Sequence, residues 1–335
     1  MGISNQKDSL EPGMPAFGRI VVLDGATVDP GDNPFDELAG LGALEVHART
    51  SPSLVIERAR GADVVLTNKT VLDAEAFAAL PGLRLVSVLA TGVNVVDLDA
   101  ARAHDVTVCN VPGYSADSVA QHVFALLVDL VGAVAEHARA VREQQWAACK
   151  DFSFWTRPLV ELAGMTMGIV GHGRIGARAG EIAHAFGMNV LAYSPSRTRA
   201  ASYEGFAWAS VEEIFARADV VSLHCPLTPT NFRFVDASLL ATMRDGSILI
   251  NTARGDLIDE AALVAALDRG RPAHASLDVL SKEPPPAGHP LTLHPRCTVT
   301  PHIAWATLAA RKRLVATTVA NVRTFAAGRP QNVVS

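Results

Sequence analysis

The stretch Gly171-His172-Gly173-Arg174-Ile175-Gly176 decides how this chain folds. It lies between an apolar run, Met165 to Val170, and a helix-like segment, Ala177 to Phe186. In a dinucleotide site the first glycine makes a tight strand-to-helix turn, the second lets the backbone approach a pyrophosphate, and the third lets the helix pack on the strand. The phosphates then sit at the helix N-terminus, where free N–H groups favour anions. The pattern therefore predicts that Gly171, Gly173 and Gly176 bind a dinucleotide.

The segments around this fingerprint indicate the fold class. Gly187 can end the helix, and Met188 to Tyr193 has the composition of the second strand of a βαβ unit. Short β-branched runs alternate with helical patterns on both sides: 20–23, 64–66, 85–89, 106–108, 220–223, 247–250, 274–277 and 298–300. This alternation is typical of an α/β protein with parallel sheets. A chain of 335 residues, 49% of them hydrophobic, can bury two cores, so we expect two doubly wound domains.

The order of the segments predicts which domain does what. Because the fingerprint opens the second series of strands, residues 118–305 are the predicted dinucleotide domain, entered by one long helix from Val119 to Trp146. Residues 18–117 form the predicted substrate domain, and a final helix, Leu308 to Ala327, packs back on it, so that 306–335 belong to it as well. We expect the active site in the cleft between the two domains. Residues 1–17 are a predicted flexible leader.

Composition excludes several classes of partner. A net charge of −5 without any run of Lys and Arg predicts binding neither to nucleic acid nor to an anionic membrane surface. The longest apolar stretch, 119–138, is interrupted by polar residues, among them Gln121, His122, Asp129 and Glu136, which argues against a membrane span. The cysteines lack the spacing of a zinc site or a disulfide framework and suggest reduced thiols in the cytoplasm: Cys109, Cys149, Cys225 and Cys297.

The end of the second strand bears on the choice of dinucleotide. NAD sites usually place Asp or Glu there, but this chain has Ser194, followed by Ser196, Arg197 and Arg199. Without a carboxylate a 2′-phosphate is not repelled, and a guanidinium can pair with it. We therefore predict NADP(H), bound with the help of Ser194, Ser196 and Arg197. Binding of NAD(H), with the two arginines only part of a solvated loop, is the alternative.

Three later segments each end a predicted strand with a polar group. Arg254, Glu283 and His302 lie in them, and ligands of open α/β sheets gather at such strand ends. Reduction of a 2-keto acid needs a cation for the carboxylate and an acid that protonates the carbonyl oxygen. Arg254 can grip a carboxylate with two hydrogen bonds, and His302 can donate the proton. Glu283, if bonded to His302, would hold its tautomer and favour its protonated form.

Taken singly, these residues have ordinary interpretations. Arg254 could be a surface residue, Glu283 a solvated carboxylate and His302 a satisfied structural histidine. Their common placement after a nucleotide motif favours the catalytic interpretation. The other histidines lack that support and are predicted to be structural, including His122, while His172 fills a tolerant position in the glycine turn.

Four ordered motifs carry a resemblance to a known family. GHGRIG (171–176), NTARGDLIDE (251–260), DVLSKEP (278–284) and PHIAWAT (301–307) resemble the D-isomer-specific 2-hydroxyacid dehydrogenases, and the resemblance covers nearly all of residues 19 to 329. Within the family the chain is most similar to the hydroxypyruvate and glyoxylate reductases, especially in TGVNVVD (91–97). The resemblance implies a Rossmann domain for NAD(P), a flavodoxin-like substrate domain and a homodimer. The aromatic residues Trp146, Phe152, Phe154 and Trp155 are our candidate interface, unless they pack within one chain.

The resemblance also implies roles for individual residues. The catalytic trio falls on Arg254, Glu283 and His302, with His302 as proton donor. Backbone N–H groups of Thr91, Gly92 and Val93 bind the substrate carboxylate, and Trp305 walls the side-chain pocket. The implied cofactor contacts are Gly173, Arg174, Ile175, Ser194, Pro226, Thr252, Ala253, Asp278 and Ala304.

The expected activity is reduction of a small 2-keto acid, hydroxypyruvate or glyoxylate, to the D-2-hydroxy acid by NAD(P)H. Formate dehydrogenases of the superfamily carry Gln where Glu283 stands, and phosphite dehydrogenases have a lysine in the loop that matches 91–94; this chain has neither. The alternative is a catalytically silent dinucleotide-binding sensor or corepressor of the same fold. Retention of all three catalytic residues argues against it.

Overall fold

The computed structural model describes residues 16–335, which divide into two units. One unit runs to Tyr114 and resumes at Ala306–Ser335, and the other is Ser115–Trp305. Residues 1–15 of the predicted leader lie outside the described residues. Phe17, the last residue of that predicted leader, is only 2% exposed and therefore packs against the folded part of the protein.

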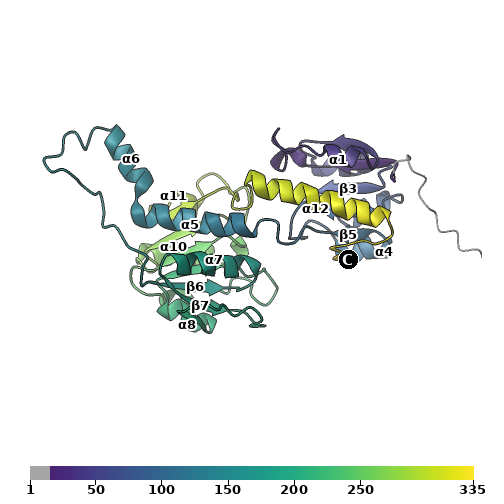
Figure 1. The fold of residues 1–335 in the computed structure, drawn as a ribbon. Coiled ribbons are helices and arrows are strands. Elements are labelled where there is room, and N and C mark those ends of the chain that lie inside the picture. The colour runs from purple at the N-terminus through teal and green to yellow at the C-terminus, as the bar shows by residue number, and fades with distance from the viewer. Residues whose placement is uncertain (1–15) are drawn as a thin grey trace, which may run out of the picture. The chain divides into compact units, whose positions relative to one another are not determined.

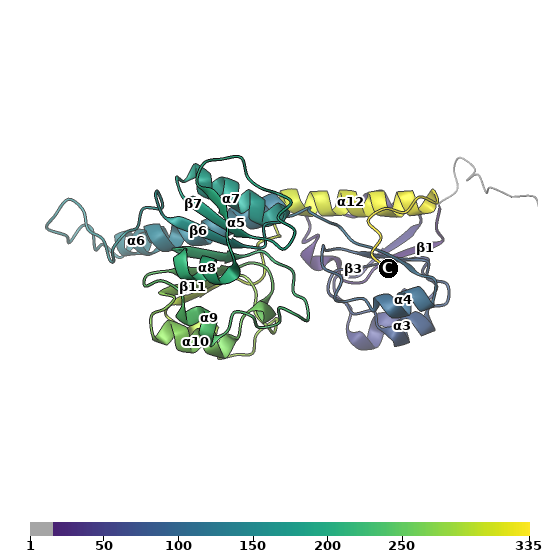
Figure 2. The same ribbon diagram turned by 90° about the horizontal axis from the view of Figure 1, so that it is seen from below.

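The first unit has a five-stranded parallel sheet with the strand order β2-β1-β3-β4-β5. This is the flavodoxin-like order, which confirms the predicted fold class of this unit. Helices α2, α3 and α4 share one core with the sheet, while α12 packs along β4, on the other side of the sheet (Figure 1, Figure 2). The strands are β1 Arg19–Val22, β2 Ala43–Val46, β3 Val64–Thr67, β4 Leu85–Val88 and β5 Thr107–Cys109. The helices are η1 Gly25–Thr27, α1 Asp36–Ala39, η2 Pro52–Leu54, α2 Val55–Ala59, α3 Ala74–Ala79, α4 Leu98–Ala103 and α12 Leu308–Ala326.

The second unit has a seven-stranded parallel sheet with the order β12-β11-β10-β9-β6-β7-β8. Two cores cover its faces: α5 and α7 pack on one face, and α8, α9 and α10 on the other (Figure 2). This doubly wound arrangement confirms the predicted Rossmann fold. The strands are β6 Thr166–Val170, β7 Asn189–Tyr193, β8 Phe206–Trp208, β9 Val220–Leu223, β10 Ile248–Asn251, β11 His274–Leu277 and β12 Cys297–Val299. The helices are α5 Ala116–Gly132, α6 Val134–Arg142, α7 Arg174–Ala185, α8 Val211–Arg217, α9 Ala237–Ala241, η3 Gly255–Leu257, α10 Glu260–Asp268 and α11 Pro290–Leu293.

The helix predicted from Val119 to Trp146 is in fact two helices. Ala133, with φ +49°, ends α5 and begins α6, and the two axes differ by 54°. A left-handed backbone conformation cannot continue a right-handed helix, so the chain turns there. In Figure 1, α6 and the loop after it extend away from the sheet of their own unit.

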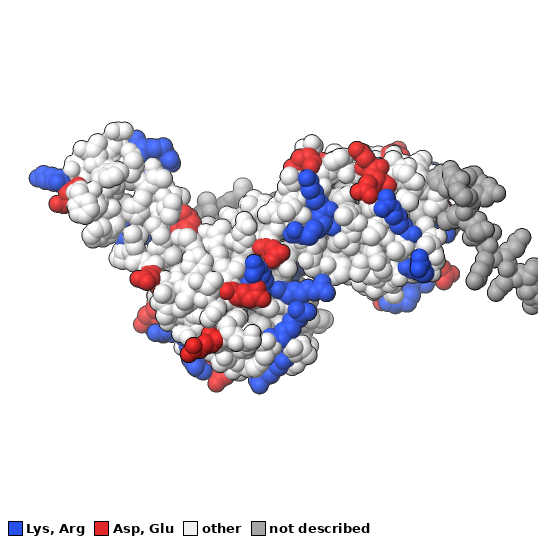
Figure 3. All heavy atoms as spheres, viewed as in Figure 1, with Lys and Arg blue, Asp and Glu red and all other residues white. Residues whose placement is uncertain are grey.

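The distribution of surface charge and the length and composition of the helices relate to the predictions on nucleic acid and membranes. Acidic and basic side chains lie side by side on the face shown in Figure 3. Among residues 16–335 no single helix has the length and apolar composition needed to cross a membrane, and only the bent pair of α5 and α6 meets both criteria together.

Candidate active site

The glycine turn joins β6 to α7, and steric contacts explain two of its glycines. Gly171 has φ +102°, and a Cβ there would lie 2.4 Å from the backbone nitrogen of Cys225. A Cβ on Gly176 would lie 2.3 Å from the carbonyl oxygen of Gly171. Neither position tolerates a side chain, because both neighbours are backbone atoms. The third glycine therefore lets α7 pack directly on the end of β6, as the fingerprint requires.

A dinucleotide fits this turn only if there is room beside the second glycine, and Gly173 faces open space. No other atom lies within 4 Å of a Cβ built on Gly173. Gly173 is also the N-cap of α7, and no side chain caps that helix. The N–H groups in its first turn, those of Arg174, Ile175 and Gly176, therefore point to a position suited to a phosphate. β6 lies between β7 and β9, where the strand order reverses, and dinucleotides bind at such a point. The turn fits a pyrophosphate.

The segment after β7 carries the residues predicted to select the cofactor. The Oγ of Ser194 lies 3.4 Å from that of Ser196, and Arg197 is exposed with φ +46°. His172 is not at this surface: it is 2% exposed, and its ring packs on Phe206 and Trp208, with centroids 5.2 and 5.4 Å away. Burial lowers the pKa of its imidazole. His172 is therefore a core residue of the turn, and the prediction that it fills a tolerant position is wrong, because its ring is enclosed by these aromatic neighbours.

The predicted catalytic residues follow three adjacent strands. Arg254 follows β10, Glu283 follows β11 and His302 follows β12, and these strands are parallel neighbours. Their carboxyl ends consequently lie at one edge of the sheet, the same edge as the glycine turn. Pro226, Thr252 and Ala253 also follow strands at this edge, after β9 and β10.

His302 and Glu283 are in direct contact. Nδ1 of His302 lies 2.6 Å from Oε2 of Glu283, while Oε1 accepts a hydrogen bond of 3.0 Å from the backbone N–H of Leu280. An ionised carboxylate only accepts, so Nδ1 carries the proton that is donated to Glu283. The other ring nitrogen, Nε2, is left to act on a substrate.

Arg254 is tied to this pair through the backbone. A Cβ on the next residue, Gly255, would lie only 1.9 Å from the carbonyl carbon of Leu280, so the loop that carries Arg254 lies directly on the loop that Glu283 holds. Asn251 fixes the Arg254 loop by donating to the carbonyl of Arg254 at 2.8 Å. Arg254 itself is half-buried, and its Nη1 donates to the carbonyl of Ala253.

Asp278 holds the turn on which His302 stands. Its carboxylate accepts from the N–H groups of Ile303 at 2.9 Å and Ala304 at 2.8 Å, and its carbonyl accepts from the N–H of His302. His302 has φ +54°, a conformation that costs a non-glycine residue about 1–3 kcal/mol and persists only where neighbours enforce it. These three hydrogen bonds hold His302 in this conformation.

The side chain of Asp278 has two further partners. Thr300 donates to its Oδ1 at 2.6 Å, and Nε2 of His122 lies 3.5 Å from the same oxygen. Burial by itself would raise the pKa of Asp278, but the bonds from His122, Thr300 and the two amides together lower it. For Asp278 and Ala304 the sequence predicted only a cofactor contact and not this role in positioning His302. It also did not predict that His122 and Thr300 bind Asp278. The cofactor contact stays a prediction.

Two sets of predicted substrate residues remain untested in their roles. Thr91, Gly92 and Val93 follow β4 in the first unit, where the hydroxyl of Thr91 donates to the carbonyl of Val111 at 2.8 Å. Trp305 is the last residue of the second unit. Their contacts with a substrate stay predictions.

Comparison with known proteins supports this interpretation of the site. Residues 124–304 match the family model described as D-isomer specific 2-hydroxyacid dehydrogenase, NAD binding domain. A hydroxypyruvate reductase of Blautia hydrogenotrophica is 43% identical over 320 residues, which is 95% of this chain and 99% of that protein. A glycerate dehydrogenase of Methylorubrum extorquens is 39% identical over 292 residues, 87% of this chain and 91% of its own.

A solved structure has the same fold over nearly the whole chain. An acyclic imino acid reductase in complex with NADPH and D-Arg matches with a TM-score of 0.83 and 26% identity, covering 95% of this chain and all (100%) of that one. The chain therefore belongs to the D-isomer specific 2-hydroxyacid dehydrogenase family and is an oxidoreductase that uses a nicotinamide dinucleotide.

Proposed function

We propose that this enzyme reduces a small 2-keto acid, either hydroxypyruvate to D-glycerate or glyoxylate to glycolate. The observation that carries the proposal is the 2.6 Å hydrogen bond between His302 and Glu283, beside the loop of Arg254 and at the same sheet edge as the glycine turn. The names of two close relatives, a hydroxypyruvate reductase and a glycerate dehydrogenase, support the substrate class. The alternative of a catalytically silent sensor gains no support from these relatives, which are named as enzymes.

The residues of the site divide the chemistry among them. When bound, the reduced nicotinamide supplies the hydride that C2 of the keto acid accepts. Arg254 binds the carboxylate and polarises the C2 carbonyl, for which its planar guanidinium is suited. His302 donates a proton from Nε2 to the C2 oxygen, and Glu283 orients the ring and stabilises its cationic form.

The test is steady-state kinetics with hydroxypyruvate, glyoxylate, pyruvate and phenylpyruvate, each with both reduced cofactors. We expect the highest kcat/KM with one of the first two acids. His302→Ala should lower kcat by about 100-fold or more, because general acid catalysis contributes about that factor. A His302→Ala protein with full activity would remove the proposed proton donor.

We further propose that NADP(H) is the preferred cofactor. Ser194 stands where a carboxylate would repel a 2′-phosphate, and exposed Arg197 lies three residues further along. Solved neighbours hold NADPH in one case and NAD in another, so the proposal rests on these residues of the chain. A ratio of kcat/KM for NADPH over NADH that falls below one would reject it.

We also propose a homodimer that uses the segment after α6. Phe152, Trp155 and Trp146 are 90%, 66% and 53% exposed, whereas Phe154 packs beside His137. Such exposed aromatic groups mark interaction surfaces. A monomeric mass by light scattering at micromolar concentration would contradict this proposal.

A cytoplasmic location is the last part of the proposal. The four cysteines, Cys109, Cys149, Cys225 and Cys297, are all free thiols, as is usual in a reducing compartment. Fractionation of the source cells, with a cytoplasmic marker enzyme followed in parallel, tests it.

A further inference from the structure

His122 is a histidine of α5 that the mechanism above does not use. Its Nε2 lies 3.1 Å from Oγ1 of Thr300, which in turn lies 2.6 Å from Oδ1 of Asp278. The side chain of His122 is 18% exposed and that of Asp278 is 1% exposed. Three polar groups, from α5, the end of β12 and the end of β11, are thus linked by a largely buried series of hydrogen bonds, called here the His122 hydrogen-bond chain.

The chemistry of the three groups sets the direction of the hydrogen bonds. The carboxylate of Asp278 can only accept, so Thr300 must give it its single O–H proton. The oxygen of Thr300 then has only lone pairs to offer His122, so Nε2 of His122 carries a proton and donates it. The hydrogen bonds therefore run from the imidazole to the hydroxyl to the carboxylate, and each bond fixes the orientation of the next group. Nε2 of His122 also lies 3.5 Å from Oδ1 of Asp278, so its proton faces the same carboxylate oxygen that Thr300 binds.

The carboxylate end of this chain meets the catalytic turn. The same Oδ1 that accepts from Thr300 also accepts from the N–H of Ile303, and Oδ2 accepts from Ala304. These two residues directly follow His302, whose φ of +54° needs such enforcement. A rotation of the Asp278 carboxylate would release both bonds together.

We propose that His122, acting through Thr300 and Asp278, is a positioning residue that holds the turn of His302 in the conformation needed for proton donation. This inference rests on the proposed function in so far as His302 is the proton donor. It assigns His122 a role in kcat and none in binding of the keto acid, because the hydrogen bonds end on the turn of His302. Cofactor affinity is no part of the inference, since Asp278 and Ala304 are themselves predicted cofactor contacts.

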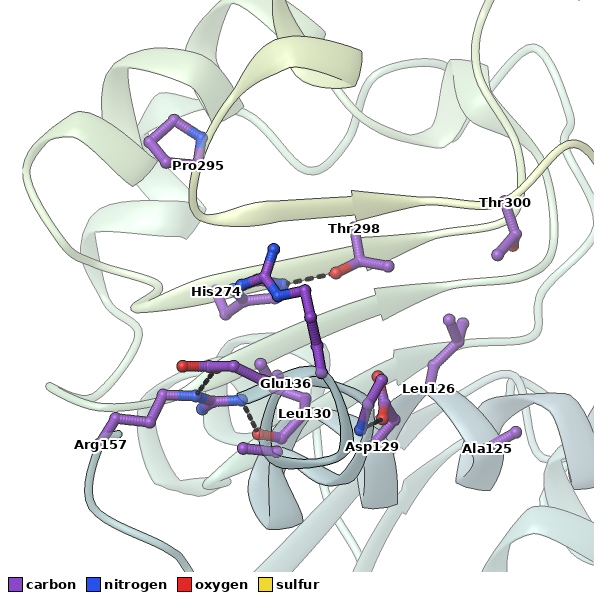
Figure 4. Close-up of a pocket in the computed structure, with 13 residues that line it drawn as sticks. Ala125, Leu126, Asp129, Leu130, Glu136, Arg157, His274, Pro295, Thr298 and Thr300 are labelled. Carbon is purple, nitrogen blue, oxygen red and sulfur yellow. Dashed lines mark hydrogen bonds and ion pairs between the residues drawn. The ribbon is translucent and has the colours of Figure 1, made fainter. Parts of the chain in front are cut away.

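The structure offers a closely matched control pair. Thr298 and Thr300 lie two residues apart and both line a cavity of about 810 Å³ in the second unit (Figure 4). The hydroxyl of Thr298 is also bonded to a histidine, Nε2 of His274, at 3.0 Å. That bond does not lead to Asp278. Thr298→Val therefore removes the same kind of hydrogen bond, from the same kind of residue, away from the catalytic turn.

The experiment compares five variants of the full-length enzyme with wild type. His122→Leu and Thr300→Val each interrupt the series of hydrogen bonds from His122 to Asp278, and the double variant removes both side chains from it. His122→Gln keeps an N–H donor near the position of Nε2, and Thr298→Val is the control. Kinetics with hydroxypyruvate give kcat and KM, and hydrogen exchange followed by mass spectrometry reports on the amides of Ile303 and Ala304 without any turnover.

The proposal predicts a specific pattern. His122→Leu and Thr300→Val each lower kcat about 10-fold, while KM for hydroxypyruvate changes less than about twofold, because a misplaced catalytic group affects the chemical step. The double variant is no worse than the more impaired single one, since both act through one chain. His122→Gln stays within about threefold of wild type. Exchange at Ile303 and Ala304 quickens in the two broken variants and not in Thr298→Val.

Several results would overturn it: equal effects of His122→Leu and Thr298→Val, a Gln variant as impaired as the Leu variant, or additive losses in the double variant. Unchanged exchange at the two amides would overturn it as well. If the wild-type enzyme turns over none of the 2-keto acids, the proposed function fails, and the exchange measurement still decides whether His122 holds the turn.

Discussion

Replacement of Gly255 by alanine is the sharpest test of how the active-site loops are held together. The added Cβ would lie 1.9 Å from the carbonyl carbon of Leu280, 2.2 Å from the nitrogen of Ser281 and 2.3 Å from the oxygen of Leu280. All three are backbone atoms, so no side chain can rotate away. Ordinary contact begins near 3.4 Å, so the two loops must move apart by about 1.5 Å.

That displacement separates Arg254 from Glu283 and His302. A misplacement of about 1 Å can cost about 100-fold in rate, so we expect kcat/KM for hydroxypyruvate to fall by about that factor. Overpacking in a tight contact costs about 1–3 kcal/mol in the free energy of unfolding. Each kcal/mol corresponds to a decrease in Tm of about 2–4 °C for a domain of this size.

The assay is oxidation of the reduced cofactor, followed with thermal unfolding of the same preparations. Gly82→Ala is the matched control, because no atom lies within 4 Å of a Cβ built there and its φ is not positive. We expect the control to retain wild-type kcat/KM and Tm. Wild-type activity in Gly255→Ala would refute the argument that this contact aligns Arg254 with the other two residues, whatever the change in Tm.

Three further predictions follow from single contacts. Gly173→Ala should leave Tm unchanged, because its Cβ meets no protein atom, but should weaken cofactor binding about 10-fold in a fluorescence titration, since the methyl group enters the space for a pyrophosphate; unaltered binding would contradict that placement. Arg254→Lys should lower kcat/KM for the keto acid by about 10- to 100-fold, because a lysine loses the two-point grip on a carboxylate; equal rates for the two proteins would argue against a carboxylate at Arg254. Asp278→Asn should lower the free energy of unfolding at pH 7 by about 1.5–3 kcal/mol. Because the pKa of Asp278 is lowered in the folded state, its contribution is present above the unfolded pKa of about 3.9 and is lost as the pH falls below it, so urea unfolding of variant and wild type should converge there.

The fold could be predicted because its decisive features are local in the sequence. The strands β3, β4, β9 and β10 are completely buried, so each is a continuous apolar or β-branched run that stands out from the helices around it. The two strands that were missed, β2 and β8, lie at sheet edges and are largely exposed or half-buried. A strand that buries few of its side chains need not be a continuous apolar run, although the other two edge strands, β5 and β12, were recognised.

The break between α5 and α6 was missed for a different reason. Ala133 is the residue with φ +49°, and alanine is the best helix former, so the local sequence predicts a continuous helix. The methyl group of Ala133 is 2% exposed, and Arg157 donates to the carbonyl of Leu130 just before the break. Contacts with residues more than twenty positions away therefore decide the turn, and these contacts are not visible in a local pattern.

The catalytic trio and His122 differ in what the sequence can reveal about them. Arg254, Glu283 and His302 could be predicted because each follows a strand, and parallel strands bring such positions to one edge. His122 lies in a helix, where no comparable rule names its neighbours. The sequence did contain one indication: a polar residue within the apolar stretch 119–138 must find a hydrogen-bond partner once that stretch is buried. The partner, Thr300, is 178 residues away and on another element, so only the packing of α5 beside the end of β12 identifies it. A buried histidine inside an amphipathic helix is therefore better interpreted as half of an unidentified pair than as a structural residue, and the edge of the sheet that the helix covers is the place to look for its partner.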